Sequence, residues 1–347
     1  MGDGTYGAIV LGSGPAGSSA AYHLSRCGLK DILVIERLSD ERFSNYHSIC
    51  GEAVSDRSMK AAGLECDAVR RIDAIEISFS GDIRARIPVK GSIIDRPSFL
   101  NGLISESGAE RIHVTARKVT FSDGMYRIDL GDRIVSAPML IGADGAHSVV
   151  RRDLFGTRPE EMVPIENCLL PGESDGVLRF TVSERMKGAY EWRFPSHDGM
   201  VSVGSVCGWD RPEGVVSKGA RHIPIGKVPE VSDGIGCCLV GDAAGLPNPL
   251  CSGGIGAALI SGRKAAEALS SGMPDLYSDF IRKDRMFDPR FMEVHRTFEG
   301  WTDAEIADAM SPFRNGYSVA RGLYAMIRRP SMARVYFGCW MGFRIGW

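Results

Sequence analysis

A short stretch in the first part of the chain brings together three side chains that could do chemistry. Residues 45–55 read NYHSICGEAVS, so that His47, Cys50 and Glu52 lie within six residues of one another. A thiol beside a base could be a nucleophile, a metal ligand or a redox group. The small residues around it could equally form a loop that fits a ligand. No third catalytic group and no further metal ligands follow, so the stretch alone leaves these alternatives open.

The composition argues against nucleic acid as a partner and gives no support to a metal site. The chain has 347 residues, 41 of them basic and 43 acidic, and its net charge is −2. A charge this small creates no global field that attracts a polyanion. The nine cysteines are scattered and form no CxxC pair, which argues against zinc sites, iron–sulfur sites and a disulfide framework. Reduced thiols are typical of a cytoplasmic protein.

A glycine-rich turn near the start of the chain predicts a dinucleotide site. Gly12-x-Gly14-x-x-Gly17 follows an apolar run of strand length and opens a helical pattern. The first glycine allows a tight turn, the second lets the backbone approach a pyrophosphate, and the third packs the helix on the strand. Glu36 ends the next apolar strand, where a carboxylate can accept hydrogen bonds from ribose hydroxyls. No second such turn follows a strand, so we expect one dinucleotide.

The remaining elements follow from hydrophobic periodicity and turn residues. Alternation predicts two strands over 74–89 around a turn at Ser80-Gly81-Asp82, and most of 160–210 has a strand pattern. The glycine, proline and serine content of 211–234 is typical of a loop. Helical patterns occupy residues 96–107, 253–272 and most of the chain after 276.

Four stretches of the chain resemble known flavoproteins. IGADGAHSVVRR (141–152) resembles the Asp-Gly motif of flavoprotein hydroxylases, and VGDAAGLPNPLCSGGIGAAL (240–259) resembles their second FAD motif. YEWRFPSHDGMVSVG (190–204) and CGEAVS (50–55) resemble segments of the geranylgeranyl reductase family. Members of that family reduce double bonds in isoprenoid chains of archaeal lipids and of chlorophyll.

The resemblance implies an α/β fold. It has a Rossmann-like FAD-binding domain of the glutathione reductase/hydroxylase type, an inserted strand-rich substrate domain and C-terminal helices. Residues 1–72, 90–158 and 235–275 would form the discontinuous FAD-binding domain, residues 73–89 and 159–234 the substrate domain, and residues 276–347 the helical region.

The resemblance also implies which residues bind FAD. The ADP half would be held by Gly12, Gly14, Ala16, Gly17 and Glu36, with Arg96 contacting the cofactor and Val119 beside the adenine. The ribityl chain and the flavin ring would be held by Asp242, Gly254 and Ile255, with Cys50, Gly51 and Ala53 in a turn over the ring.

Cys50, Tyr190 and Trp192 are the candidate catalytic residues. For Cys50 we favour shaping of the flavin site, ahead of proton or electron transfer by the thiol and of simple packing. Tyr190, Trp192 and Phe194 alternate and therefore share one face of a strand. This face is either a core face or an aromatic wall for an apolar substrate, with the Tyr190 hydroxyl as a proton donor.

The resemblance implies an FAD-dependent oxidoreductase of isoprenoid lipid biosynthesis. It would reduce carbon–carbon double bonds of a geranylgeranyl-type polyprenyl lipid, with reduced nicotinamide or ferredoxin as the external electron donor. One alternative is an FAD-dependent monooxygenase or halogenase that acts on a small aromatic compound. Another is an electron-transfer flavoprotein that reduces a quinone, although the iron–sulfur cysteine run of that class is absent.

The end of the sequence combines arginines with aromatic residues. Residues 326–347 (MIRRPSMARVYFGCWMGFRIGW) could meet a membrane surface, or they could form a final helix that closes over a core. Base rates favour the final helix. The sequence contains no run of 18 apolar residues. We therefore expect a cytoplasmic protein, and peripheral membrane contact through this segment stays an open alternative.

Overall fold

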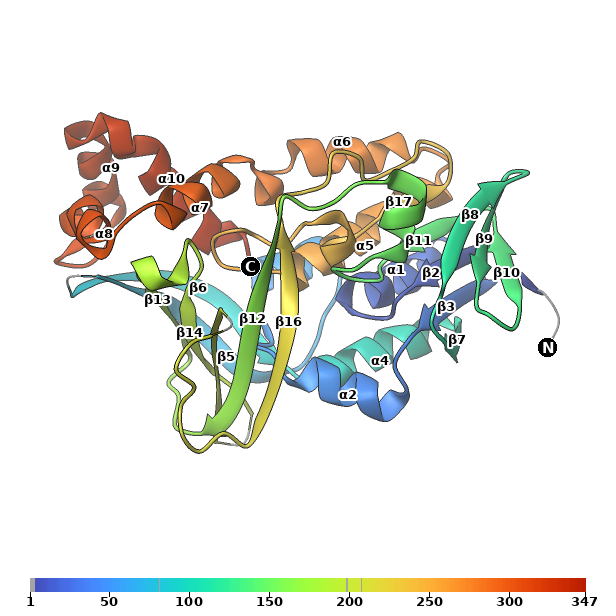
Figure 1. The fold of residues 1–347 in the computed structure, drawn as a ribbon, viewed down its shortest axis with the longest axis horizontal. Helices are drawn as coiled ribbons and strands as arrows, with labels where there is room; N and C mark the ends of the chain where they lie inside the picture. The colour runs from blue at the N-terminus through green and yellow to red at the C-terminus, as the bar shows by residue number, and fades with distance from the viewer. Residues whose placement is uncertain (1–3, 81, 198, 207) are drawn as a thin grey trace.

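The computed structural model describes residues 4–80, 82–197, 199–206 and 208–347. Its described strands form three sheets, which follow one another along the long axis of the molecule, and helices gather at the end that carries the last part of the chain (Figure 1). No helix among these residues is long and apolar enough to cross a membrane.

A five-stranded parallel sheet forms the centre of one part of the molecule. Its strands, in spatial order, are β17 (Cys237–Leu239), β11 (Leu140–Gly142), β2 (Ala8–Leu11), β3 (Ile32–Glu36) and β7 (Glu110–His113). Every residue of β2 and β3 is buried, as expected for parallel strands that are covered on both faces. Helix α1 (Pro15–Arg26) packs against α4 (Arg96–Ser107) and α5 (Ile255–Ser270).

An eight-stranded sheet lies beside it. Its spatial order is β16 (Ser217–Ile225), β12 (Glu161–Pro171), β15 (Met200–Val206), β14 (Glu191–Pro195), β13 (Val177–Val182), β5 (Ala68–Phe79), β6 (Ile83–Ile94) and β4 (Ala53–Ser55). Among the described strands of this sheet, β13 and β5 pair in parallel and the other neighbours pair antiparallel. A small sheet of β1 (Gly4–Thr5), β10 (Ile134–Ala137), β9 (Met125–Asp129) and β8 (Lys118–Ser122) lies at the opposite end from the C-terminal helices (Figure 1).

The helices after α5 pack on two parts of the molecule: the first lies against α5, and the later ones bury side chains in the apolar cluster of the eight-stranded sheet. They are α6 (Asp275–Lys283), α7 (Arg290–Glu299), α8 (Asp303–Met310), α9 (Val319–Arg328) and α10 (Ala333–Ile345). Helix α10 buries Tyr336, Met341 and Phe343 in one apolar cluster with residues of β5, β6 and β13. This confirms the interpretation of the last segment as a helix that closes over a core.

Most predicted elements are present, and one prediction is wrong. The expected hairpin is β5 and β6, and the expected helices over 96–107 and 253–272 are α4 and α5. Residues 211–234 are not all loop, because β16 pairs with β12 along its whole length. As an edge strand, β16 tolerates the glycine and proline that suggested a loop. The α/β fold class is confirmed, whereas the domain boundaries stay a prediction.

Candidate functional site

A cleft of about 600 Å³ lies at the carboxyl ends of the parallel strands. Its lining includes residues at or just after the carboxyl end of each of the five strands. Ligands usually bind at this edge of an α/β sheet. The lining includes Gly12, Gly14, Glu36, Arg37, His47, Arg96, Asp144, Arg221 and Asp242.

Two of the three glycines of the turn leave no room for a side chain, and the third has room for one. Gly12 has a φ of +100°, and a Cβ on it would lie 2.4 Å from the carbonyl oxygen of Ala143. A Cβ on Gly17 would lie 1.9 Å from the carbonyl oxygen of Gly12. A Cβ on Gly14 would meet only the ring of His47, at 3.6 Å. Gly14 therefore presents bare backbone to the cleft, as a pyrophosphate requires.

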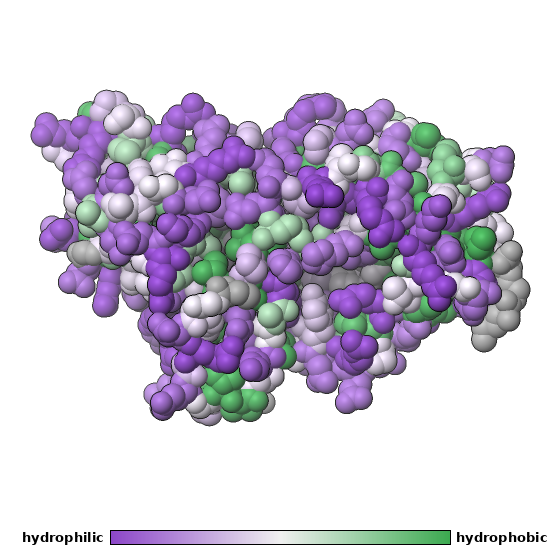
Figure 2. Space-filling view, viewed as in Figure 1, coloured by the Kyte–Doolittle hydropathy of each residue, from purple (hydrophilic) through white to green (hydrophobic). Residues whose placement is uncertain are grey.

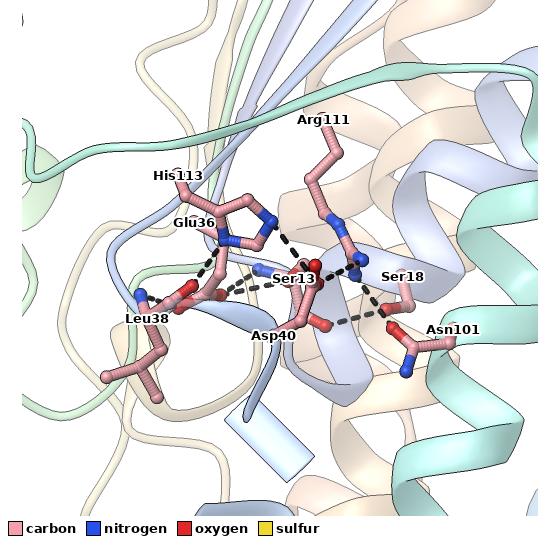
Figure 3. Close-up of polar contacts among 8 residues, drawn as sticks. All are labelled: Ser13, Ser18, Glu36, Leu38, Asp40, Asn101, Arg111 and His113. Atoms are coloured by element: carbon pink, nitrogen blue, oxygen red, sulfur yellow. Dashed lines mark hydrogen bonds and ion pairs between the residues drawn. The ribbon is translucent and has the colours of Figure 1, made fainter. Parts of the chain in front are cut away.

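The carboxylate of Glu36 is held in place by three donors of the surrounding chain (Figure 3). The backbone N–H and hydroxyl of Ser13 donate to its Oε2 at 3.0 and 2.9 Å. The N–H of Leu38 donates to its Oε1 at 2.9 Å. Because a carboxylate has about four acceptor positions, Glu36 keeps capacity for a hydroxyl group of a ligand.

Asp242 lies in the wall of the cleft, on a turn that Arg151 of the motif at residues 141–152 holds in place. The guanidinium of Arg151 donates to the carbonyl oxygens of Ala243 at 2.8 Å and of Ala146 at 2.6 Å, which ties the two motifs together. Burial raises the pKa of Asp242 to about 6, although Arg221 and other arginines act in the opposite direction. A polar ligand that donates to this carboxylate would stabilise its charged form.

The stretch around Cys50 is fastened to α4 by Arg96. The guanidinium of Arg96 donates to the carbonyl oxygen of His47 from Nε at 2.9 Å and from Nη2 at 2.6 Å. The backbone N–H of Arg96 donates to Oε1 of Glu52 at 3.3 Å. Burial raises the pKa of Glu52 to about 7, so the protonated form persists close to neutral pH. Burial and neighbouring arginines lower the pKa of His47, which is therefore neutral.

A second, apolar cavity of about 120 Å³ lies on the other side of this stretch. It is bounded by Ile49, Cys50, Gly51, Glu52 and Ala53, by Cys251, Ser252, Gly253, Gly254 and Ile255, and by the aromatic rings of Phe180, Tyr190, Trp192, Phe194 and Trp347. Arg221 lines both this pocket and the cleft. The structure therefore places an aromatic pocket beside the larger cleft, with the stretch around Cys50 between them.

Two contacts fix the pocket wall. The hydroxyl of Tyr190 donates to the carbonyl oxygen of Cys251 at 2.6 Å, and burial raises its pKa. A Cβ on Gly51 would lie 2.6 Å from the ring of Phe194, so glycine lets the loop pack directly on an aromatic face. The aromatic strand face is thus both part of the core and part of the pocket.

Comparison with known proteins decides the family. No family model matches the chain. Digeranylgeranylglycerophospholipid reductase 2 of Methanothermobacter thermautotrophicus is 30% identical over 317 residues, which are 78% of this chain and 80% of that protein. The chain belongs to the geranylgeranyl reductase family. The reductase 1 of Methanopyrus kandleri is 27% identical over 334 residues, 84% of this chain and 87% of the relative.

A solved structure shares the fold of this chain. The geranylgeranyl bacteriochlorophyll reductase-like protein of Thermoplasma acidophilum superposes with a TM-score of 0.79 at 20% identity, over 96% of this chain and all of that one. The fold class and the family that the sequence motifs indicated are both confirmed.

The predicted site residues divide between the two cavities. The cleft is lined by Gly12, Gly14, Glu36, Arg96 and Asp242, and the apolar pocket by Cys50, Gly51, Ala53, Tyr190, Trp192, Gly254 and Ile255. Their roles toward a cofactor or a substrate stay predictions.

Three predicted residues line neither cavity. Ala16 and Gly17 are buried in the packing of α1. Val119 is buried in β8, and its N–H donates to Asp153 Oδ2 at 2.9 Å. The part of the cleft wall formed after β7 consists of residues 114–116 instead.

Two residues of the site were missed by sequence reasoning. Glu52 was visible as part of an acid–thiol stretch, but its burial and its bond to Arg96 depend on the tertiary fold. Arg221 lies in the segment that was predicted to be a loop, so nothing in the local sequence pointed to the cleft. Its guanidinium donates to the carbonyl oxygen of Tyr46 at 3.0 Å and contacts that ring.

Proposed function

We propose that the protein is an FAD-dependent reductase that adds hydrogen across the carbon–carbon double bonds of a polyprenyl lipid. The observation that carries this proposal is the aromatic, apolar pocket directly beside the dinucleotide cleft. The names of the two curated relatives, which are reductases of a digeranylgeranyl lipid, support the same substrate class. Flavin-dependent halogenases share the fold, but their similarity is evidence for the fold alone.

The residues of the cleft fit FAD. Two buried polar atoms in its wall, Nδ1 of His47 and Oδ1 of Asp144, have no hydrogen-bond partner within the described part of the chain. Buried polar atoms are rarely left unpaired, which points to a polar ligand in the cleft. Gly14 and Glu36 would meet the ADP half, and Asp242 would meet the ribityl chain. When bound, the flavin supplies the hydride.

Glu52 is our candidate for the proton donor of the reaction. An unactivated alkene needs a proton together with the hydride, and a dry pocket must provide it from a placed acid. The hydroxyl proton of Tyr190 is already donated to a carbonyl oxygen, whereas Glu52 lines the pocket and stays protonated up to a pH of about 7. Solvent would return the proton to Glu52 after each cycle.

We also propose that the protein meets an anionic membrane surface, and that α9 rather than α10 makes this contact. Val319, Leu323, Tyr324 and Ile327 are exposed, and their spacing places them on one face of α9, opposite the buried Gly322 and Ala325. Residues 311–347 contain six arginines and no acidic residue. A helix with an apolar face and nearby cations suits a layer of anionic headgroups.

The position of α9 would bring the lipid to the pocket. Helices α8, α9 and α10 lie together at one end of the molecule (Figure 1), and α9 shares its apolar cluster with Phe180 and Tyr190 of the pocket wall. The face of the molecule that Figure 2 shows is mainly hydrophilic, with small apolar areas.

The test of the proposed function is a reoxidation experiment under anaerobic conditions. The purified protein is loaded with FAD, reduced with dithionite and mixed with polyprenyl lipids. We expect the absorbance of oxidised flavin to return, and the lipid to gain about two mass units per double bond through hydride plus proton. Oxygen consumption stimulated by small aromatic acids, without lipid turnover, would instead favour a hydroxylase.

A further inference from the structure

A histidine and two glutamates converge outside the lining of the cleft and of the apolar pocket. They are Glu161 at the start of β12 and His295 and Glu299 on α7, and their ligand atoms all lie within 4.8 Å of one another. Nε2 of His295 lies 3.3 Å from Oε2 of Glu161. None of these residues lines the cleft or the apolar pocket.

The imidazole of His295 is buried and oriented. His295 is only 1% exposed, and its Nδ1 lies 3.1 Å from the carbonyl oxygen of Gly188. Because a carbonyl oxygen can only accept, Nδ1 carries the hydrogen of this bond. In the neutral ring Nε2 then presents a lone pair toward the two carboxylates, and it has no hydrogen-bond partner within the described residues. Metal-binding histidines are commonly oriented by such a bond from the other ring nitrogen.

Three electron-pair donors that face one another can hold a positive charge between them. The neighbouring cations have other partners: Arg296 pairs with Glu160, and Arg334 pairs with Glu293. We propose that Glu161, His295 and Glu299 bind a divalent transition-metal ion of the zinc class, with water as the remaining ligand.

The geometry agrees with this donor set. Zinc bonds to nitrogen and oxygen of about 2.0–2.2 Å at tetrahedral angles place two ligand atoms about 3.3–3.6 Å apart. The separation of Nε2 of His295 from Oε2 of Glu161 is already 3.3 Å. Glu299 is exposed, so its side chain can close the remaining gap by a rotamer change. The ion would fasten α7 to the first residue of β12 and so hold the C-terminal helices on the eight-stranded sheet.

The experiment uses the full chain, stripped with a chelator and then titrated with Zn²⁺ alone. We expect saturable binding by calorimetry and a melting temperature that rises with Zn²⁺, because a ligand that binds only the folded state stabilises it. Co²⁺ in place of Zn²⁺ should give a tetrahedral ligand-field spectrum without a thiolate charge-transfer band. Glu299→Gln should weaken binding at least about tenfold, while Glu293→Gln on the same helix should bind as the unchanged protein does.

Three results would overturn the proposal. One is the absence of saturable Zn²⁺ binding, and another is equal binding by Glu299→Gln and the unchanged protein. The third is a thiolate band with Co²⁺, which would place the ion at a cysteine such as the exposed Cys27. Because Glu299 is exposed, its replacement leaves the fold intact, and the test does not depend on His295 variants.

Discussion

Glu52 is the residue at which burial most directly predicts a pH dependence. Its pKa of about 7 lies above the ordinary value of 4.5, so the folded protein keeps the acid protonated below pH 7 and loses that proton above it. We expect the rate at which substrate reoxidises the reduced flavin to fall as pH rises through about 7. Glu52→Gln should remove this dependence and slow the step by about 10²–10⁴-fold, as for loss of a general acid.

Rapid-mixing absorbance over a pH series measures the Glu52 effect. Flavin reduction by dithionite is the internal control and should not change in Glu52→Gln. If the variant keeps both the rate and the slope of the unchanged protein, the proton comes from another group, such as Cys50 or Tyr190.

Asp242 tests the cofactor side of the site. Asp242→Ala removes a buried acceptor from the cleft, and hydrogen bonds to charged groups contribute about 1.5–3 kcal/mol. We therefore expect FAD affinity to fall by about 10–100-fold, which titration of flavin fluorescence measures. Asp210→Ala, at an exposed surface position, is the matched control and should bind FAD normally. Unchanged FAD affinity in the Asp242 variant would show that FAD does not contact Asp242.

At the scale of single elements, α9 gives a prediction about membranes. The double variant Leu323→Ser/Ile327→Ser should lose flotation with vesicles that contain phosphatidylglycerol. Each of these exposed side chains contributes about 1.5–3 kcal/mol when it enters an apolar layer. The control Met273→Ser/Leu276→Ser changes two similarly exposed apolar residues near α6 and should float as before. High salt should weaken the contact because the arginine attraction is screened. Equal losses in both variants would contradict a surface specific to α9.

Local pattern predicted the elements whose neighbours are close in sequence. The glycine turn, β3 ending at Glu36, and the β5–β6 hairpin follow from residues that lie within about one supersecondary unit. Edge strand β16 could not be predicted, because its pairing with β12 depends on a partner far away in the chain. For the same reason the cluster of Glu161 and His295 could not be predicted from the sequence, because its members share no local motif.

At the scale of the whole molecule, Trp347 joins parts of the chain that are far apart. Its main-chain oxygen accepts from the hydroxyls of Ser55 at 2.6 Å and Ser58 at 2.7 Å. Its indole packs directly on Gly91 of β6, where a Cβ would lie only 2.5 Å from the ring. Gly346, the residue before Trp347, packs as closely on Gly253, where a Cβ would lie 2.1 Å from the carbonyl oxygen of Gly346. The last helix is thus packed onto the eight-stranded sheet and onto the segment before α5.

We expect Trp347→Ala to lower the free energy of unfolding by about 3–5 kcal/mol, as for other large buried aromatic residues. Urea denaturation followed by circular dichroism measures the change. Tyr324→Ala, which truncates a ring that is 60% exposed, should change it by less than about 0.5 kcal/mol. If Trp347→Ala changes the free energy of unfolding as little as Tyr324→Ala does, the docking of residue 347 adds little stability.

The size of the apolar pocket has a consequence for how a long substrate would be processed. An apolar cavity of about 150 Å³ holds a single benzene molecule, and this pocket measures about 120 Å³. It therefore has room for roughly one five-carbon isoprene unit, while the rest of a polyprenyl chain stays outside. Such a protein would reduce one double bond at a time, and its activity would not depend on the total length of the chain. The chain would have to move by one unit between rounds, so partially saturated lipids should be detectable before the fully saturated product.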